Sequence, residues 1–74
     1  MYTVDNVELR KRMIDKGLNT IQQMADACGL SRDTMSDIVN GRVRPGAMAI
    51  YAIAAVLDLE PEVLGRIFFK KIVA

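Results

Sequence analysis

The sequence predicts an all-α fold, a compact bundle of five short helices that forms one domain over residues 1–74. Apolar residues recur every three or four positions in successive stretches, and residues that cap or end helices separate these stretches. The composition agrees, because 51% of the residues are hydrophobic although the chain has only two Tyr, two Phe and no Trp. An aliphatic, methionine-rich core suits plain helical packing. We expect the helices near residues 5–16, 21–28, 32–39, 45–57 and 61–72.

The first helix is expected to follow an extended lead-in over residues 1–4, with Thr3 or Asp5 as its candidate cap, and we favour a start near Asp5. Four apolar residues at near-helical spacing are expected to face the core: Val7, Leu9, Met13 and Ile14. Gly17 is expected to end the helix. The basic run over residues 10–12 has two interpretations. It is either a solvated helix face, which is the commoner case, or a phosphate contact beside the neighbouring helices.

The second and third helices are predicted from a central segment in which two short apolar stripes flank a Gly-Leu-Ser turn. Thr20 and Gln23 have the spacing of a capping box, and Gly29 suits the left-handed end of the second helix. Ser31 can cap the third helix. The two stripes are, in order, Ile21, Met24, Ala25 and Cys28, then Met35, Ile38 and Val39. Two helices of about two turns that fold together across a tight turn form a helix-turn-helix.

The fourth helix is expected to open at Pro45, and the fifth at Pro61. The fourth carries a core stripe consisting of Ile50, Ile53, Ala54 and Leu57. In the fifth, Leu64 and Ile67 should turn inward, which leaves more apolar surface than one helix needs to close a small core. We therefore predict an association surface made of Phe68, Phe69, Ile72 and Val73. The alternative is that this helix only completes the core.

The central segment and the loop after it resemble the Cro/repressor-type (XRE-family) helix-turn-helix DNA-binding domains of small phage regulators. The resemblance covers roughly residues 7–64 and rests on Ala25, Gly29, Leu30, Ile38, Asn40, Gly41, Arg42, Pro45 and the apolar run over residues 53–57. It implies a repressor-like fold and a double-stranded DNA operator as partner. The third helix would then read the major groove, and the chain would act as a homodimer.

The resemblance also implies roles for individual residues. Base reading falls to the outward side chains of the third helix, namely Arg32, Asp33, Thr34, Ser36 and Asp37. Phosphate contact falls to Gln22, Asn40, Arg42 and Arg44, with a solvated loop as the alternative for the two arginines.

The chain also departs from the family pattern. Ile21 stands where the family often has a phosphate-touching glutamine, so Gln22 is the expected substitute. Asp58 replaces the usual glycine after the fourth helix, which is tolerable because Asp enters the left-handed region more readily than most residues. Where the family commonly has a buried Arg–Glu ion pair, we assign Ile14 and Val39, and we expect them to pack together as an apolar replacement.

Catalysis is not expected, because the chain has no histidine, no metal-ligand spacing and no glycine-rich phosphate loop. We predict a non-enzyme without cofactor, metal or small-molecule substrate. Cys28, the lone cysteine, lies on an apolar stripe and is interpreted as core. Because the chain lacks a signal-peptide pattern and an apolar stretch of about 20 residues, we expect a cytoplasmic location and no membrane partner.

Two functions from different classes remain. The first is a sequence-specific DNA-binding transcriptional regulator that lays two recognition helices in successive major grooves. The second is a protein-binding module on the same fold, an antirepressor or antitoxin-like chain that binds a partner regulator. The resemblance favours DNA, whereas the net charge of only +1 and the aspartates at positions 33 and 37 favour a protein partner.

Overall fold

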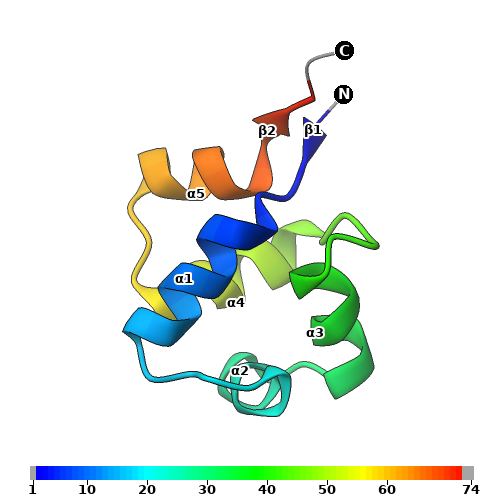
Figure 1. Ribbon diagram of the computed structural model, residues 1–74, viewed down its shortest axis with the longest axis vertical. Helices are drawn as coiled ribbons and strands as arrows, with labels where there is room; N and C mark the ends of the chain where they lie inside the picture. The colour runs from blue at the N-terminus through cyan, green and yellow to red at the C-terminus, as the bar shows by residue number, and fades with distance from the viewer. Residues whose placement is uncertain (1, 73–74) are drawn as a thin grey trace.

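The computed structural model describes residues 2–72, which form five helices and one two-stranded antiparallel sheet (Figure 1). The elements are β1 (Tyr2–Thr3), α1 (Asn6–Asp15), α2 (Ile21–Cys28), α3 (Arg32–Val39), α4 (Ala47–Leu57), α5 (Pro61–Phe68) and β2 (Lys70–Lys71). The predicted all-α five-helix class is confirmed, with the short sheet as an addition. Figure 1 shows that the sheet brings the two chain ends together at one end of the molecule. No helix in residues 2–72 combines the length and the apolar character needed to traverse a bilayer.

The α2–turn–α3 unit forms as its capping residues predict. The Thr20 side chain accepts a hydrogen bond from the Gln23 amide, and the Gln23 side chain accepts one from the Thr20 amide, which completes the capping box. Gly29 ends α2 with a φ of 70°, a left-handed conformation that glycine adopts without steric cost. The Ser31 side chain then caps α3 by accepting from the Thr34 amide. Two adjacent helix ends are thus satisfied within one short turn, and α2 packs more extensively against α3 than any other pair of elements does.

One apolar core lies where the helices meet, and it is aliphatic and methionine-rich as predicted. Its buried hydrophobic residues in the described chain are Val4, Leu9, Met13, Met24, Ala25, Met35, Ile38, Val39, Ile50, Ile53, Leu57, Ile67 and Phe68. No polar or charged side chain in residues 2–72 is buried among them. No polar side chain therefore has to be desolvated in the core, and the side chains of the core stabilise the fold through apolar burial.

The inward-facing set predicted for α1 is half wrong. Leu9 and Met13, four residues apart, are buried, but Val7 and Ile14 are 74% and 64% exposed. The reason is helical geometry, because Val7 and Ile14 lie two turns apart on a different stripe from Leu9 and Met13. Val4 in the lead-in is buried and fills space beside the helix instead.

The predicted packing of Ile14 on Val39 is therefore also wrong as a core contact. Val39 is fully buried, whereas Ile14 lies at the rim of a small surface depression of about 140 Å³ that both residues help to line. Met13 lines the same depression and is buried. Met13, one residue earlier in the chain, is thus a buried α1 residue that lines the same depression as Val39.

The boundaries of α4 are partly as predicted. The helix begins at Ala47, not at Pro45, because Gly46 is extended (ψ 170°) and serves as the N-cap. Pro45 is buried just before it. At the other end, Asp58 adopts the expected left-handed conformation with a φ of 54°. The Leu59 amide donates to the Ala54 carbonyl over 2.9 Å, so the turn closes the helix as a left-handed cap normally does.

The end of α5 differs most from the prediction. The helix stops at Phe68, and Phe69 leaves it with a φ of −128°. The following residues form β2, in which Lys71 pairs with Tyr2 and Lys70 pairs with Thr3. A hydrogen bond of 2.6 Å from the Asp5 amide to the Ile67 carbonyl joins the same two segments. The extended lead-in thus supplies backbone partners that a helix to residue 72 would not have used.

This change revises the predicted association surface. Phe68 is buried in the core, so it cannot belong to a surface. Phe69 and Ile72 remain 41% and 48% exposed, and Val73 lies outside the described residues. As expected, Ile67 is fully buried, and Leu64 packs against the core.

Candidate nucleic-acid interface

The outer face of α3 carries the side chains that were predicted to read bases. Met35, Ile38 and Val39 are buried on the inner face, which fixes the helix orientation. The five predicted residues occupy the rest of the circumference: Arg32, Asp33 and Thr34 are exposed, and Ser36 and Asp37 are half-buried. In Figure 1 the helix lies along the edge of the molecule, with α2 beneath it and no other element covering its outer side.

The N-terminal turn of α3 leaves two charged side chains free of partners in the described chain. Arg32 and Asp33 make no hydrogen bond or ion pair within residues 2–72, whereas the Thr34 hydroxyl accepts a bond of 2.8 Å from the Ser31 hydroxyl. A carboxylate is electrostatically favourable in the first turn of a helix, which accounts for Asp33 in the folded chain. Arg32 and Asp33 are thus the residues best placed to contact an external partner.

The C-terminal end of α3 is different, because its polar side chains bind one another. Arg42 donates from Nε to Asp37 Oδ1 over 2.9 Å and from Nη2 to Ser36 Oγ over 3.0 Å. Asn40 donates from Nδ2 to the Ser36 carbonyl over 2.8 Å, and it accepts a short hydrogen bond from Arg10 of α1. We call these residues the α3-end network: Arg10, Ser36, Asp37, Asn40 and Arg42. It holds two arginines beside the C-terminal end of α3.

The network changes the electrostatic role of Asp37. Both side chains of the Asp37–Arg42 pair are about half exposed to solvent, so the pair contributes little to stability, on the order of 1 kcal/mol or less. It nevertheless neutralises the Asp37 carboxylate and places the Arg42 guanidinium over the end of α3. Asp33 is then the only carboxylate of α3 without a cationic partner in residues 2–72.

Arg10 is the residue of this interface that sequence reasoning did not single out. The basic run over residues 10–12 pointed to it, but the pattern does not show which of the three side chains faces α3. In the folded chain Arg10 reaches Asn40, Arg12 pairs with Glu8 on its own helix, and Lys11 is exposed. Only the packing of α1 on α3 decides this.

The remaining predicted phosphate contacts are spread around the network. Gln22 is exposed at the start of α2, but its amide donates to Asp26 over 2.8 Å. Arg44 is exposed in the loop after α3, and its guanidinium carbon lies 5.4 Å from the centre of the Phe69 ring. Both residues can contact an external group, although each already has an intrachain partner.

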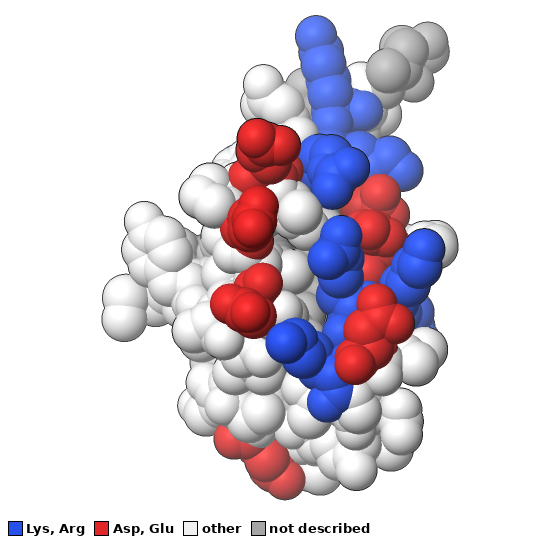
Figure 2. All heavy atoms as spheres, turned by 90° about the vertical axis from the view of Figure 1, so that its left-hand side faces the viewer, with Lys and Arg blue, Asp and Glu red and all other residues white. Residues whose placement is uncertain are grey.

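Charge on another face of the molecule is mixed. Figure 2 shows Lys and Arg side chains interleaved with Asp and Glu, so no continuous basic field covers this view. Any attraction to a polyanion must therefore come from a local cluster, such as the two arginines at the end of α3, because the net charge is only +1.

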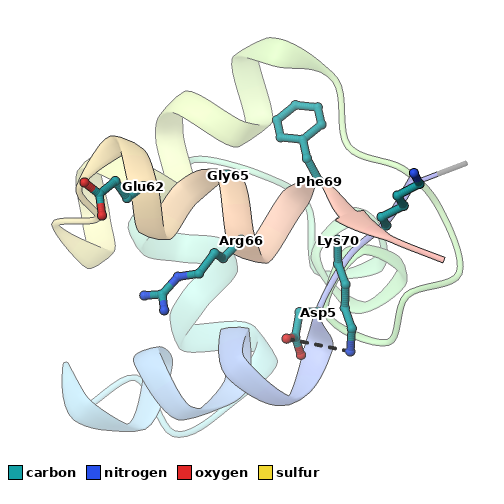
Figure 3. Close-up of a pocket in the computed structure, with 7 residues that line it drawn as sticks. Asp5, Glu62, Gly65, Arg66, Phe69 and Lys70 are labelled. Atoms are coloured by element: carbon teal, nitrogen blue, oxygen red, sulfur yellow. Dashed lines mark ion pairs between the residues drawn. The ribbon is translucent and has the colours of Figure 1, made fainter. Parts of the chain in front are cut away.

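A surface depression of about 710 Å³ lies between α5 and the sheet rather than at α3. Its charged lining does not converge on one point: Figure 3 shows Glu62 and Arg66 directed away from the Asp5–Lys70 ion pair, whose atoms are 3.8 Å apart. Within residues 2–72, no group of three or more His, Cys, Asp or Glu side chains is placed to hold a metal ion. Neither feature defines a catalytic centre.

The geometry defines a helix-turn-helix domain in which the outer face of α3 is uncovered. Residues 8–64, more than half of the chain, match the family model of the Cro/C1-type HTH DNA-binding domain, and the chain belongs to this family. The family is typically non-enzymatic, and membership identifies the chain as a DNA-binding transcription regulator. No curated protein and no solved structure matches the chain.

Proposed function

We propose that this chain is a sequence-specific regulator of the phage Cro/repressor kind that inserts α3 into the major groove of an operator. The supporting observation is that α3 buries its whole apolar stripe and leaves a polar outer face uncovered. An α-helix with its side chains is about 10–12 Å across, so α3 can enter a major groove that is about 12 Å wide.

Base reading is assigned mainly to the first turn of α3. Arg32 has no intrachain partner and carries the donor pair that recognises O6 and N7 of guanine. Asp33 can accept from N4 of cytosine, and Thr34 can contact a thymine methyl group. Ser36 and Asp37, by contrast, are engaged with Arg42, so their role in reading is secondary to holding that arginine.

Phosphate contact is assigned to the residues that follow and flank α3. Arg42 and Asn40 lie at its C-terminal end, and Arg44 follows in the same loop, with Gln22 at the start of α2. We add Arg10 to this proposal, because its hydrogen bond to Asn40 joins a second guanidinium to the α3-end network that holds Arg42. Two arginines at one end of α3 could both contact DNA phosphates, and such contacts fix the register of a recognition helix on the duplex.

The test is a comparison of DNA affinities. An operator is first selected from a random duplex library, and binding is then measured as a function of salt. Arg32→Ala should relax discrimination at one base pair by roughly 1–3 kcal/mol, whereas Arg42→Ala/Asp37→Asn should weaken all duplexes alike and lower the salt slope by about one. The double change removes the pair without leaving a bare carboxylate. Lys11→Ala, which removes an exposed charge outside the network, is the control.

We further propose that the regulator is a homodimer that associates through the exposed apolar residues of its terminal sheet. Tyr2, Phe69 and Ile72 are each about half exposed, and a symmetric operator requires two copies. Ile72→Asp should halve the mass in sedimentation equilibrium while the helical circular dichroism is retained. An unchanged dimer mass would move the interface elsewhere.

The second candidate is a protein-binding module, antirepressor or antitoxin-like, that binds a partner regulator. Asp33 favours it, because an unpaired carboxylate on the reading face repels DNA and suits a basic protein surface. The sequence alone suggested that both Asp33 and Asp37 favour a protein partner. Asp37 no longer supports this, because it pairs with Arg42. Failure of every duplex to bind at low salt, with binding created by Asp33→Asn, would support this candidate over the first.

A further inference from the structure

The two chain ends meet beside the loop that follows α3. β1 and β2 pair antiparallel, and a cavity of about 200 Å³ lies between this sheet and the loop. Its lining includes Tyr2, Thr3 and Val4 from the start of the chain, residues 41–44 of the loop, and Ile72. The first residues of the chain and Ile72, which are about 40 and 30 positions away from the loop in sequence, thus line the same cavity as the loop.

Arg44 is the loop residue that contacts Phe69, the residue that joins α5 to β2. Its guanidinium carbon lies over the Phe69 ring, 5.4 Å from the ring centre. Phe69 is fixed in turn by Tyr2, whose ring meets it edge-on, with 6.2 Å between centres and an interplanar angle of 79°. Arg44 makes no hydrogen bond or ion pair within the described part of the chain. The aromatic contact is therefore what restrains its side chain.

We infer that Phe69 is a positioning residue for Arg44, and that the terminal sheet thereby sets one of the DNA backbone contacts. The guanidinium lies over the ring, and its planar fork of N–H donors has no hydrogen-bond or ion-pair partner within residues 2–72. Those donors stay available for a phosphate oxygen. A side chain held in this way loses less conformational freedom on binding, which raises affinity without adding a contact.

The inference rests on the proposed role of Arg44 as a phosphate contact. It also separates the two arginines of the loop. Arg42 is held by α3 through Asp37 and Ser36, whereas Arg44 is held by the chain ends through Phe69. Contact with the DNA backbone would then depend on both α3 and the terminal sheet, and only α3 belongs to the helix-turn-helix.

A double-mutant cycle tests this coupling. The probe is a mixed-sequence duplex of about 30 base pairs, because a phosphate contact does not depend on sequence. Affinity and salt slope are measured for the wild type, Phe69→Leu, Arg44→Ala and the double variant. Phe69→Leu should weaken binding about twofold to fivefold, as expected for loss of an exposed cation–π contact, and should cause no further loss once Arg44 is alanine. Phe69→Tyr keeps the ring and should bind like the wild type.

Two controls separate positioning from association and folding. Ile72→Ala trims an exposed apolar residue of the same sheet region that offers no aromatic ring to the Arg44 guanidinium, and its effect should be the same with and without Arg44. The mass of each variant is measured at the assay concentration. In the unmutated chain, the Arg44 side-chain proton resonances should be shifted upfield by the ring current of Phe69, and this measurement does not depend on any variant's folding.

The outcomes are distinct. Equal losses from Phe69→Leu in both backgrounds, no loss in either, or an unshifted Arg44 resonance would each overturn the inference. If Arg44→Ala changes neither affinity nor salt slope while the duplex still binds, the phosphate role of Arg44 fails although DNA binding stands. If no duplex binds at all, the proposed function itself fails.

Discussion

The burial of Val39 against α1 offers a sharp test of the fold. Val39→Glu places a carboxylate at a position that is fully buried in the present structure. The family resemblance implies a buried Arg–Glu pair here; Met13 is buried and lines the same depression as Val39, whereas Ile14 is 64% exposed. We therefore predict that Met13→Arg rescues Val39→Glu and that Ile14→Arg does not.

The magnitudes follow from burial. Val39→Glu loses apolar burial and strands a charge, which together should cost about 4 kcal/mol. A domain of this length has a free energy of unfolding of about 4–11 kcal/mol, so the single variant lies near the threshold of stability. Met13→Arg should recover about 1–3 kcal/mol as a coupling energy, because its long stem can cross the depression that both residues line. Arg at the exposed position 14 should couple by less than about 0.5 kcal/mol.

The assay is urea unfolding followed by circular dichroism for each single and double variant. Val39→Gln is the neutral control, which separates the charge from the change in shape. Burial should raise the pKa of the new Glu carboxyl above its unfolded value. The penalty of Val39→Glu relative to Val39→Gln should therefore be small near about pH 4 and should grow as the pH rises through the unfolded pKa. Equal rescue by Ile14→Arg and Met13→Arg would refute this account of α1.

Two further predictions concern single residues. Burial raises the pKa of the Cys28 thiol, so the thiol ionises at lower pH in the unfolded chain than in the folded one. The free energy of unfolding should therefore fall as the pH rises above the ordinary thiol pKa of about 8.5. Cys28→Ala should remove this fall. Identical pH profiles for the two proteins would contradict it. Asp58 has a φ of 54°, so Asp58→Gly should relieve strain and raise stability by about 0.5 kcal/mol, or Tm by about 3 °C, whereas Asp58→Ala should lower both. A less stable glycine variant would show that the aspartate side chain matters more than its backbone.

Local signals were sufficient for the helix-turn-helix. Capping by Thr20, Gln23 and Ser31 and the left-handed glycine at position 29 involve residues within four positions of each other, so the sequence determines them before any tertiary contact forms. The family could be predicted for the same reason, because its characteristic residues are turn, cap and stripe positions at fixed spacing.

Within α1, spacing determined a helix but not which stripe of it is buried. Val7 and Ile14 and the pair Leu9 and Met13 are both apolar pairs at helical spacing, and only packing against α3 and α5 selects the second pair. The same packing brings Arg10 to Asn40, which no local pattern specifies.

The sheet and the surroundings of the loop arginines were decided by tertiary structure alone. Residues 69–72 are compatible with a helix by their own pattern, but β1 lies within reach and satisfies their backbone groups instead. Because Tyr2 and Lys71 are 69 positions apart, neither segment signals the pairing by itself. Phe69 reaches Arg44 for the same reason. The sequence by itself thus determined the recognition unit, whereas the long-range pairing of the chain ends determined what surrounds it, since such contacts exist only once the core has formed.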